Sequence, residues 1–231
     1  MMHTTKTFGE QMLRFYDALT VPSLPGGVEP LLPFRKEQVR NGMTAFYQRY
    51  YNDSNPRVLL FGINPGRLGA GLTGIGFTDP VRLQENCGIP NPHPKRTEPS
   101  STFIYDVIDA FGGAQHFFAH FHFSSVCPIG FVHNGINMNY YDTPQLREAT
   151  TPFILESMNK QLTMNIKRSV AFTVGKGQNH RFLEKQNTEH GFFSKLGTLP
   201  HPRWVMQYRY KTRHLYVEEY VRTLGAVLNE F

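Results

Sequence analysis

Two short polar motifs, each held by a proline, contain the residues of this 231-residue chain that could do chemistry. Asn64 opens the first, "NPG", within a stretch (residues 59–77) that holds six glycines and no acidic side chain, and His201 opens the second, "HPR". Because proline fixes its own φ angle, each polar side chain is expected to be held rigidly. An amide can orient a water molecule but is a poor base, whereas an imidazole can stabilise a developing negative charge. Taken singly, Asn64 could also satisfy its own turn, and His201 could be a surface imidazole.

The elements around these motifs predict a parallel β-sheet that places both at one edge. Short apolar runs predict strands at 57–62, 122–126, 169–175 and 195–200. Helices are expected at 5–19, 34–50 and 100–111, briefly from Asp79-Pro80, from Thr143-Pro144 onward, up to about His190, and from about Thr212. Alternating strands and helices favour a parallel sheet covered on both faces, and ligands of such sheets bind at the carboxyl ends of the strands. The segments that leave those ends are 62–78, 127–143, 175–177 and 201–208.

Length and composition predict one domain. With 40% apolar residues and no linker-like stretch, residues 1–231 are expected to form a single unit whose N-terminal helices (1–52) precede the first strand. No stretch reaches the roughly 18 apolar residues that a membrane helix needs, so we expect a soluble, cytoplasmic monomer, associated with the nucleoid if the source is bacterial. Cys87 and Cys127 lack further ligands at metal spacing and are expected to be reduced and buried.

A basic segment near the C-terminus indicates an anionic partner. Residues 167–213 hold ten Lys/Arg and two acidic residues, a net charge of +8, whereas the rest of the chain holds 14 and 16, a net charge of −2. Its cations alternate with aromatic residues, as in "HPRWVMQYRYKTRH", which is typical of surfaces that bind a phosphate backbone. A solvated basic face would explain the charge equally well.

Two other patterns suggest cofactors, and we favour a structural interpretation of each. Gly69-x-Gly71-x-x-Gly74 has dinucleotide-binding spacing but does not open directly from strand to helix, so no nucleotide cofactor is expected. His116, His120 and His122 could include a helical metal-binding pair, yet aromatic residues separate them and no carboxylate is near. We favour a packed aromatic helix end, and a metal hydrolase built on these histidines stays open as an alternative.

The glycine-rich segment "GINPGRLGAGLTGIGF", residues 62–77, resembles the first motif of the uracil-DNA glycosylase superfamily. The similarity is to the form used by the single-strand-selective monofunctional (SMUG) branch, G-M-N-P-G-P-F-G-M-x-Q-T-G-V-P-F, with Phe or Trp at the seventh position. Eight of the fifteen specified positions coincide. The "HPR" at His201 stands where that family has H-P-S-P-R, and the "SVCP" at Ser125 stands where it has N-L-C-P. The resemblance runs from about residue 55 to the end.

The resemblance implies an α/β fold, a three-layer α/β/α sandwich around a four-stranded parallel sheet. It also implies a DNA repair enzyme that hydrolyses the N-glycosidic bond of uracil in DNA, leaves an abasic site, and uses no metal or organic cofactor. By the same resemblance, Asn64 positions the attacking water, Phe77 stacks on the flipped base, and His201 stabilises the departing base. Gly66 would leave room at the C5 edge of the base. The substrate-binding positions implied are Gly62, Ile63, Pro65, Gly66, Phe77 and Ser125.

DNA is the expected partner, single-stranded and, as a further expectation, double-stranded. A base must leave its stack before an enzyme can reach it, and another group must fill the gap that it leaves. We expect Arg203, Trp204 or Met206 to fill this gap. Phosphate contacts are expected from Arg203, Arg209, Lys211 and Arg213, which would position the strand without reading it.

The sequence departs from the family pattern at two places. Ser125 stands where the family uses Asn to read the pyrimidine edge, and one hydroxyl cannot replace both the donor and the acceptor of an amide. This predicts a broader specificity that includes deaminated purines such as xanthine, and hydroxymethyluracil. The second motif lacks the Ser-Pro between "HP" and Arg203, which shortens that loop. A catalytically inactive member that binds nucleic acid or a nucleobase remains the alternative function.

Overall fold

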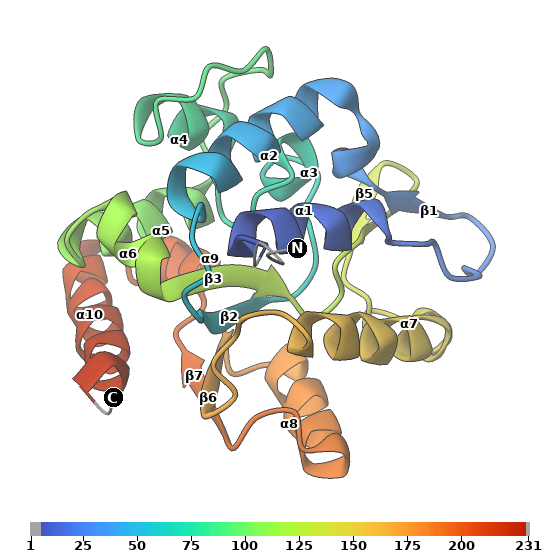
Figure 1. Ribbon diagram of the computed structural model, residues 1–231. Coiled ribbons are helices and arrows are strands. Elements are labelled where there is room, and N and C mark those ends of the chain that lie inside the picture. Colours follow the sequence, from blue (N-terminus) through green and yellow to red (C-terminus); the bar gives the residue numbers. More distant parts are fainter. Residues whose placement is uncertain (1–5, 230–231) are drawn as a thin grey trace, which may run out of the picture.

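The computed structural model describes residues 6–229 and centres on a parallel sheet of four strands (Figure 1). The strands are β2 (Val58–Gly62), β3 (Phe121–Ser125), β6 (Val170–Val174) and β7 (Lys195–Leu199), in the spatial order β3-β2-β6-β7. β2 and β6 are buried along their whole length, which their continuous apolar runs require of central strands covered on both faces. This sheet confirms the predicted fold class.

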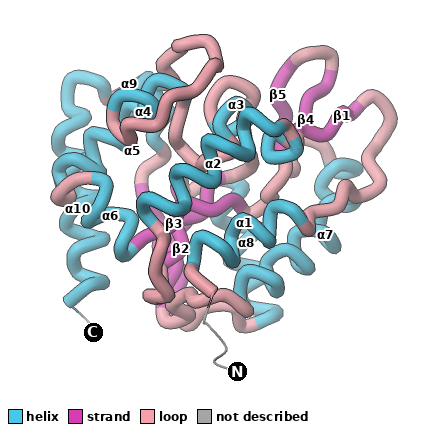
Figure 2. Tube along the Cα trace, turned by 45° about the horizontal axis from the view of Figure 1, so that its top comes forward, coloured by secondary structure: helices cyan, strands magenta, loops and turns pink. Residues whose placement is uncertain are grey.

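Helices cover both faces of the sheet and form the outer layers of the sandwich. In both views α5 and α10 lie on one side of the sheet, and α7 and α8 lie on the other (Figure 1, Figure 2). The helices are α1 (Phe8–Asp17), α2 (Glu37–Tyr50), α3 (Ala70–Thr73), α4 (Pro80–Glu85), α5 (Pro99–Ala110), α6 (Ala114–His120), α7 (Pro144–Leu162), α8 (Gln178–His190), α9 (Pro202–Tyr208) and α10 (Arg213–Asn229). Two 3-10 turns, η1 (Pro33–Arg35) and η2 (Tyr210–Thr212), complete the list.

The N-terminal segment forms the two predicted helices and one strand that was not predicted. α1 begins at a capping box in which the Thr7 hydroxyl accepts from the Glu10 amide and the Glu10 carboxylate accepts from the Thr7 amide. The predicted start at residue 5 lies outside the described residues. The expectation that only helices precede the first strand is wrong, because β1 (Val28–Leu31) lies between α1 and α2.

β1 belongs to a small antiparallel sheet beside the main one. It pairs with β4 (Gly130–His133), which pairs in turn with β5 (Ile136–Met138). Asn134 and Gly135 connect β4 to β5 with φ angles of 49° and 74°, the left-handed conformations that a tight two-residue hairpin turn needs. Segment 127–143, expected only to leave the end of a strand, therefore contains a hairpin.

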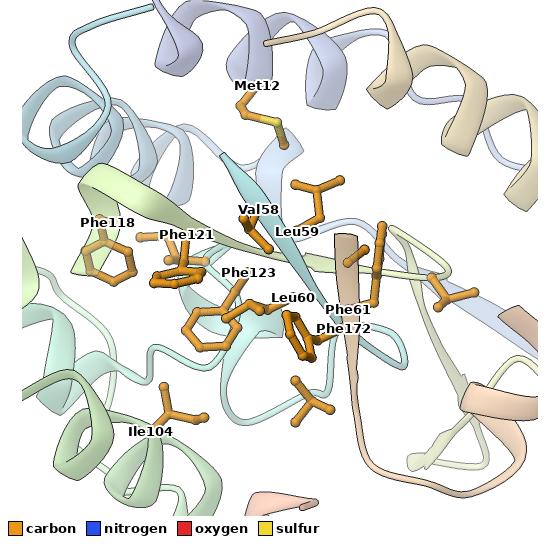
Figure 3. Packing of buried hydrophobic residues seen from close by; sticks show 14 of the residues in the cluster. Met12, Val58, Leu59, Leu60, Phe61, Ile104, Phe118, Phe121, Phe123 and Phe172 are labelled. Carbon is orange, nitrogen blue, oxygen red and sulfur yellow. The ribbon is translucent and has the colours of Figure 1, made fainter. Parts of the chain in front are cut away.

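The core is built around β2 and is strongly aromatic. Figure 3 shows Leu60 of β2 among Phe123 and Phe172 from the neighbouring strands, with Met12 of α1 lying away from Ile104 of α5. At the start of β2, buried Arg57 forms an ion pair with Asp53 and donates to the Phe118 carbonyl. Both cysteines are buried and free, as expected. Between residues 6 and 229, no helix combines the length and apolarity that a membrane crossing needs.

Candidate active site

The Asn64 side chain is fixed by two main-chain hydrogen bonds just beyond the carboxyl end of β2. Its Nδ2 donates to the Met138 carbonyl over 3.1 Å, and its Oδ1 accepts from the Tyr140 amide over 3.1 Å. These bonds define which side-chain atom is the oxygen. One N–H and one lone pair of Oδ1 remain for a ligand or a water molecule. The amide is therefore oriented before any ligand binds.

A buried polar chain supports this arrangement from below. The Tyr140 hydroxyl donates to Oδ1 of Asn179 over 3.0 Å, and Nδ2 of Asn179 donates to the Gly62 carbonyl over 3.2 Å. Burial raises the pKa of Tyr140, so the hydroxyl keeps the proton that it donates. Tyr140 and Asn179 were not predicted as site residues. The sequence indicates them only by their positions, because Tyr140 lies in segment 127–143 and Asn179 lies next to segment 175–177, both of which were expected at the carboxyl edge.

Phe77 reaches the end of β2 through a left-handed backbone conformation, with a φ of 52°. This φ is uncommon for a bulky residue and indicates a conformation that the surrounding fold imposes. The ring meets Phe123 edge to face, with centroids 5.1 Å apart. A methyl group at position 62 would lie 3.2 Å from Cε2 of Phe77, so Gly62 admits the ring where another residue would displace it.

Ser125 lies directly beside Gly62, because the parallel register of β2 and β3 pairs these two residues. Its hydroxyl makes no hydrogen bond with any described part of the chain. Ser125 also lines a recess of about 20 Å³ with Pro65, Gly76 and other residues, including Tyr16 and Phe34 from the N-terminal segment. That volume is about the room that one water molecule needs. A hydroxyl and a water molecule together can present the donor and acceptor that the amide of the family motif would supply.

The predicted site residues of the glycine loop follow one another around a tight turn. Ile63 is partly buried, and its carbonyl accepts from the Cys127 amide over 3.0 Å. The turn closes with a 2.7 Å bond from the Gly71 amide to the Gly66 carbonyl. A methyl group on Gly66 would have its nearest neighbour, Nδ2 of Asn137, at 3.8 Å, so this glycine borders open space.

An acidic residue outside the predicted segments contacts the glycine loop. The Glu98 carboxylate occupies the space that a side chain at Gly69 would need. Burial and the nearby Asp79 raise the pKa of Glu98, while Arg203 acts in the opposite direction. Glu98 thus lies between the glycine loop and the second motif, although the sequence predicted no acidic residue there.

His201 caps the short helix α9, which begins at Pro202, and its ring is oriented by the helix that it caps. The Arg203 amide donates to Nδ1 of His201 over 3.2 Å. This assigns the proton of the neutral ring to Nε2, which is then a hydrogen-bond donor. Burial, with a contribution from Arg203, lowers the pKa of His201 below its usual value of 6.5, which favours the neutral ring. Gly175 packs against the ring, where a methyl group would lie 3.1 Å from Cδ2.

The sheet sets the distance between the two motifs. Asn64 follows β2 and His201 follows β7, and β6 lies between these strands. Two strand spacings correspond to roughly 9–10 Å, wide enough for a nucleoside to lie between the motifs. The predicted catalytic pair therefore lies along one edge of the sheet, with Phe77 and Ser125 on the Asn64 side.

The predicted DNA-binding residues lie between the start of α9 and the start of α10. Arg203, Trp204, Arg209 and Lys211 are exposed, whereas Met206 is partly buried and Arg213 is half-buried. The guanidinium of Arg209 lies 5.1 Å from the centroid of the Trp204 ring. Arg213 lies 3.7 Å from the Asp106 carboxylate, which reduces its net contribution to the surface charge.

The three histidines of the alternative metal site do not converge. His116 and His120 lie on α6 with ring centroids 5.1 Å apart, but His122 points into an aromatic cluster that includes Phe8 and Tyr51. Burial and the nearby Arg57 lower the pKa of His122 to about 3. Within residues 6–229 no group of three or more His, Cys, Asp or Glu side chains is arranged to hold a metal ion. The packed aromatic helix end is thus the better interpretation.

The fold defines a class, the α/β/α sandwiches built on a four-stranded parallel sheet, and ligands of such sheets bind at the carboxyl ends of the strands. The model of the uracil DNA glycosylase superfamily matches residues 48–225. The chain therefore belongs to this superfamily of DNA glycosylases, which act in DNA repair.

Within the superfamily the chain is SMUG-like. The crystal structure of wild-type Pedobacter heparinus SMUG2 superposes with a TM-score of 0.94 and shares 42% sequence identity. The match covers 97% of this chain and 100% of that one. It thus includes the N-terminal segment, to which the motif resemblance did not extend.

Proposed function

We propose that the protein hydrolyses the N-glycosidic bond between uracil and deoxyribose in DNA and leaves an abasic site. The observation that carries this proposal is the fixed Asn64 amide, whose remaining lone pair can hold a water molecule at the carboxyl edge. Asn64 would accept a hydrogen bond from the water and turn its oxygen toward C1′ of the sugar. Because an amide cannot take the proton, the water must attack late, after the bond to the base has largely broken.

His201 would stabilise the departing base. Bond breaking places positive charge on the sugar and negative charge on the pyrimidine, and a fixed donor aimed at the pyrimidine lowers the barrier. The Nδ1 bond from the Arg203 amide leaves the Nε2–H of a neutral ring for this role. The Phe77 ring would stack on the extruded base, and Gly62 would provide the space in which that ring lies.

Ser125 supports a specificity broader than uracil. A hydroxyl that is unengaged within residues 6–229, beside a recess with room for about one water molecule, can adapt its donor and acceptor to different base edges. We therefore propose that xanthine and hydroxymethyluracil are also released. Excision of uracil alone from a panel of lesion-containing oligonucleotides would contradict this part of the proposal.

Single-stranded DNA is the proposed substrate form, with phosphates bound by Arg203, Arg209 and Lys211 over the surface of α9 and η2. Arg203 is the best placed of the three candidates to fill the gap left by the base. Met206 is partly buried, and Trp204 packs against Arg209 and Tyr216. We further propose a monomeric, monofunctional enzyme that breaks no strand itself.

The test is release of uracil from a labelled single-stranded oligonucleotide in EDTA, read as alkali-cleavable sites. The parent should give product, and Asn64→Ala and His201→Ala should each lose about 100-fold or more in rate, the scale of a lost transition-state contact. Asn159→Ala and His190→Ala replace exposed residues of the same types on α7 and α8 and should retain the parental rate.

Three results would contradict the proposal. Parental rates in Asn64→Ala and His201→Ala would remove their assigned roles. Strand breaks without alkali, or a covalent adduct trapped by borohydride, would indicate a lyase. Binding without base release from uracil, xanthine and hydroxymethyluracil substrates would favour the alternative of an inactive nucleic-acid-binding member.

A further inference from the structure

An apolar cleft opens next to the candidate active site, beside His201. It has a volume of about 370 Å³ and is lined by Lys176, Pro200, His201, Trp204, Tyr216 and Glu219. His201 therefore borders both the proposed position of the departing base and this second space. Its volume falls in the lower part of the range of small-molecule sites, roughly 300–1,000 Å³.

Two aromatic rings form one wall of the cleft. Trp204 and Tyr216 meet edge to face with centroids 5.7 Å apart, and Trp204 remains 40% exposed. Arg209 covers part of the Trp204 ring. This packing fixes the indole as a wall and makes it a poor group to insert between bases. Tryptophan is also the residue most enriched where a surface binds a partner tightly.

The charges at the cleft fit a neutral flat group joined to a phosphate. Lys176 and Glu219 offset each other, so the interior favours no net charge. The Lys176 ammonium forms no ion pair within residues 6–229 and is exposed, so it can meet a phosphate at the rim. A nucleobase combines these properties, because its faces are apolar and its sugar carries a phosphate on either side.

The positions of His201 and Trp204 also fit neighbouring nucleotides of one strand. Trp204 follows His201, the N-cap of α9, by three residues, and both residues line the cleft. Because neighbouring nucleotides are joined covalently, a strand whose extruded base lies at His201 would bring the next nucleotide to the side of the indole.

We infer that this cleft binds the nucleobase next to the excised one, by stacking it on Trp204 and Tyr216. The inference rests on the proposed function, since it needs the excised base at His201. It makes the enzyme a reader of two consecutive nucleotides, with chemistry at the first and stacking at the second.

The test uses three short single-stranded oligonucleotides with a central uracil on a 2′-fluoroarabinose sugar, which disfavours positive charge at C1′ and slows cleavage. One has normal bases on both sides, one has a tetrahydrofuran spacer on the 5′ side, and one has it on the 3′ side. The spacer removes the base and keeps the phosphates, so the charge is unchanged. Binding is measured for the parent, for Trp204→Leu, and for Tyr208→Leu, which replaces an exposed aromatic residue of α9 that does not line the cleft.

The expected result is that one spacer, on the 5′ or the 3′ side, weakens binding of the parent and of Tyr208→Leu by about 5- to 150-fold, the range for one lost stacked base. Trp204→Leu should lose this discrimination. Trp204 is the only tryptophan of the chain, so its fluorescence reports on the cleft. The fluorescence should change on binding of the oligonucleotide that has normal bases on both sides, and it should change less with the oligonucleotide whose spacer weakens binding. If circular dichroism shows that Trp204→Leu does not fold, Tyr216→Leu replaces it.

Equal affinity of the parent for all three oligonucleotides would overturn the inference, as would discrimination that survives in Trp204→Leu. Excision of uracil from the corresponding deoxyribose oligonucleotides is measured in parallel. If uracil is excised but neither spacer changes the affinity, the inference about the cleft is refuted and the proposed function stands. If a spacer weakens binding but uracil is not excised, the proposed function is refuted and the cleft remains a nucleobase-binding site.

Discussion

Replacing Tyr140 with Phe should lower the rate of excision as well as the stability, because its hydroxyl begins the polar chain beneath Asn64. Tyr140→Phe removes one 3.0 Å bond and leaves Oδ1 of Asn179 buried without a partner. One such bond contributes about 1 kcal/mol. If all of it serves to hold the Asn64 loop, kcat can fall by at most about fivefold. Asn179→Ala removes both bonds, so its limit is about 2 kcal/mol, or roughly 30-fold.

Tyr51→Phe is the matched control for this prediction. Tyr51 is equally buried, and its hydroxyl donates over 3.0 Å to the Phe121 carbonyl, at the opposite end of the sheet from the site. Both variants should lose about 1–2 kcal/mol of unfolding free energy in urea titrations. Only Tyr140→Phe should lower kcat, measured under single turnover on a uracil oligonucleotide. Equal kcat values for the two variants at equal stability would refute the positioning role of Tyr140.

Two further predictions concern groups that the fold holds under constraint. Gly71→Ala should cost about 1–3 kcal/mol of unfolding free energy, because its methyl group would lie 2.5 Å from the Gly66 carbonyl oxygen. Gly66→Ala should cost under about 1 kcal/mol, because the nearest neighbour of its methyl group would be 3.8 Å away. Equal losses of unfolding free energy in urea titrations of the two variants would contradict this prediction. The pKa of His122 is about 6.5 in the unfolded chain and about 3 in the folded chain, so stability falls as the pH drops through this window, by roughly 3 kcal/mol from this residue at pH 4.5. His122→Leu should therefore lose less stability between pH 7 and pH 4.5 than the parent does, and parallel losses would show that His122 does not carry this acid sensitivity.

The main sheet could be predicted because its strands are continuous apolar runs bounded by glycine and proline. β2 and β6 match their predicted positions to within a residue, since buried central strands carry a strong sequence signal. β1 could not be found in this way. It contains a proline, is mostly exposed, and depends on pairing with β4, a contact about a hundred residues away along the chain. The β4–β5 hairpin does carry a local signal, because Asn134-Gly135 is a dipeptide typical of a two-residue hairpin turn.

The candidate site was predictable to the extent that it follows strand ends. Asn64 and His201 were predicted from proline-bounded loops at the carboxyl edge, and the structure places both at that edge. Their hydrogen-bond partners were not predictable, because the Asn64 side chain binds the main chain of residues 138 and 140, and main-chain atoms carry no residue signature. Glu98 was missed for a related reason. It lies in a loop far from any strand end and reaches the site only because Gly69 leaves space for its carboxylate.

In this site, the residues that orient Asn64 and His201 differ from the residue proposed to select the base, Ser125. The Asn64 side chain bonds to the main chain of the β5–α7 connection, and the His201 ring accepts from the main chain of α9, so the direct contacts of both side chains are made by main-chain atoms. Ser125, by contrast, presents only its own hydroxyl to the recess beside β2. On the proposed function, a substitution at such a position can change which base edge is accepted without moving the Asn64 amide or the His201 imidazole. This separation predicts that exchanging Ser125 for Asn changes which bases are released while the positions of Asn64 and His201 stay the same.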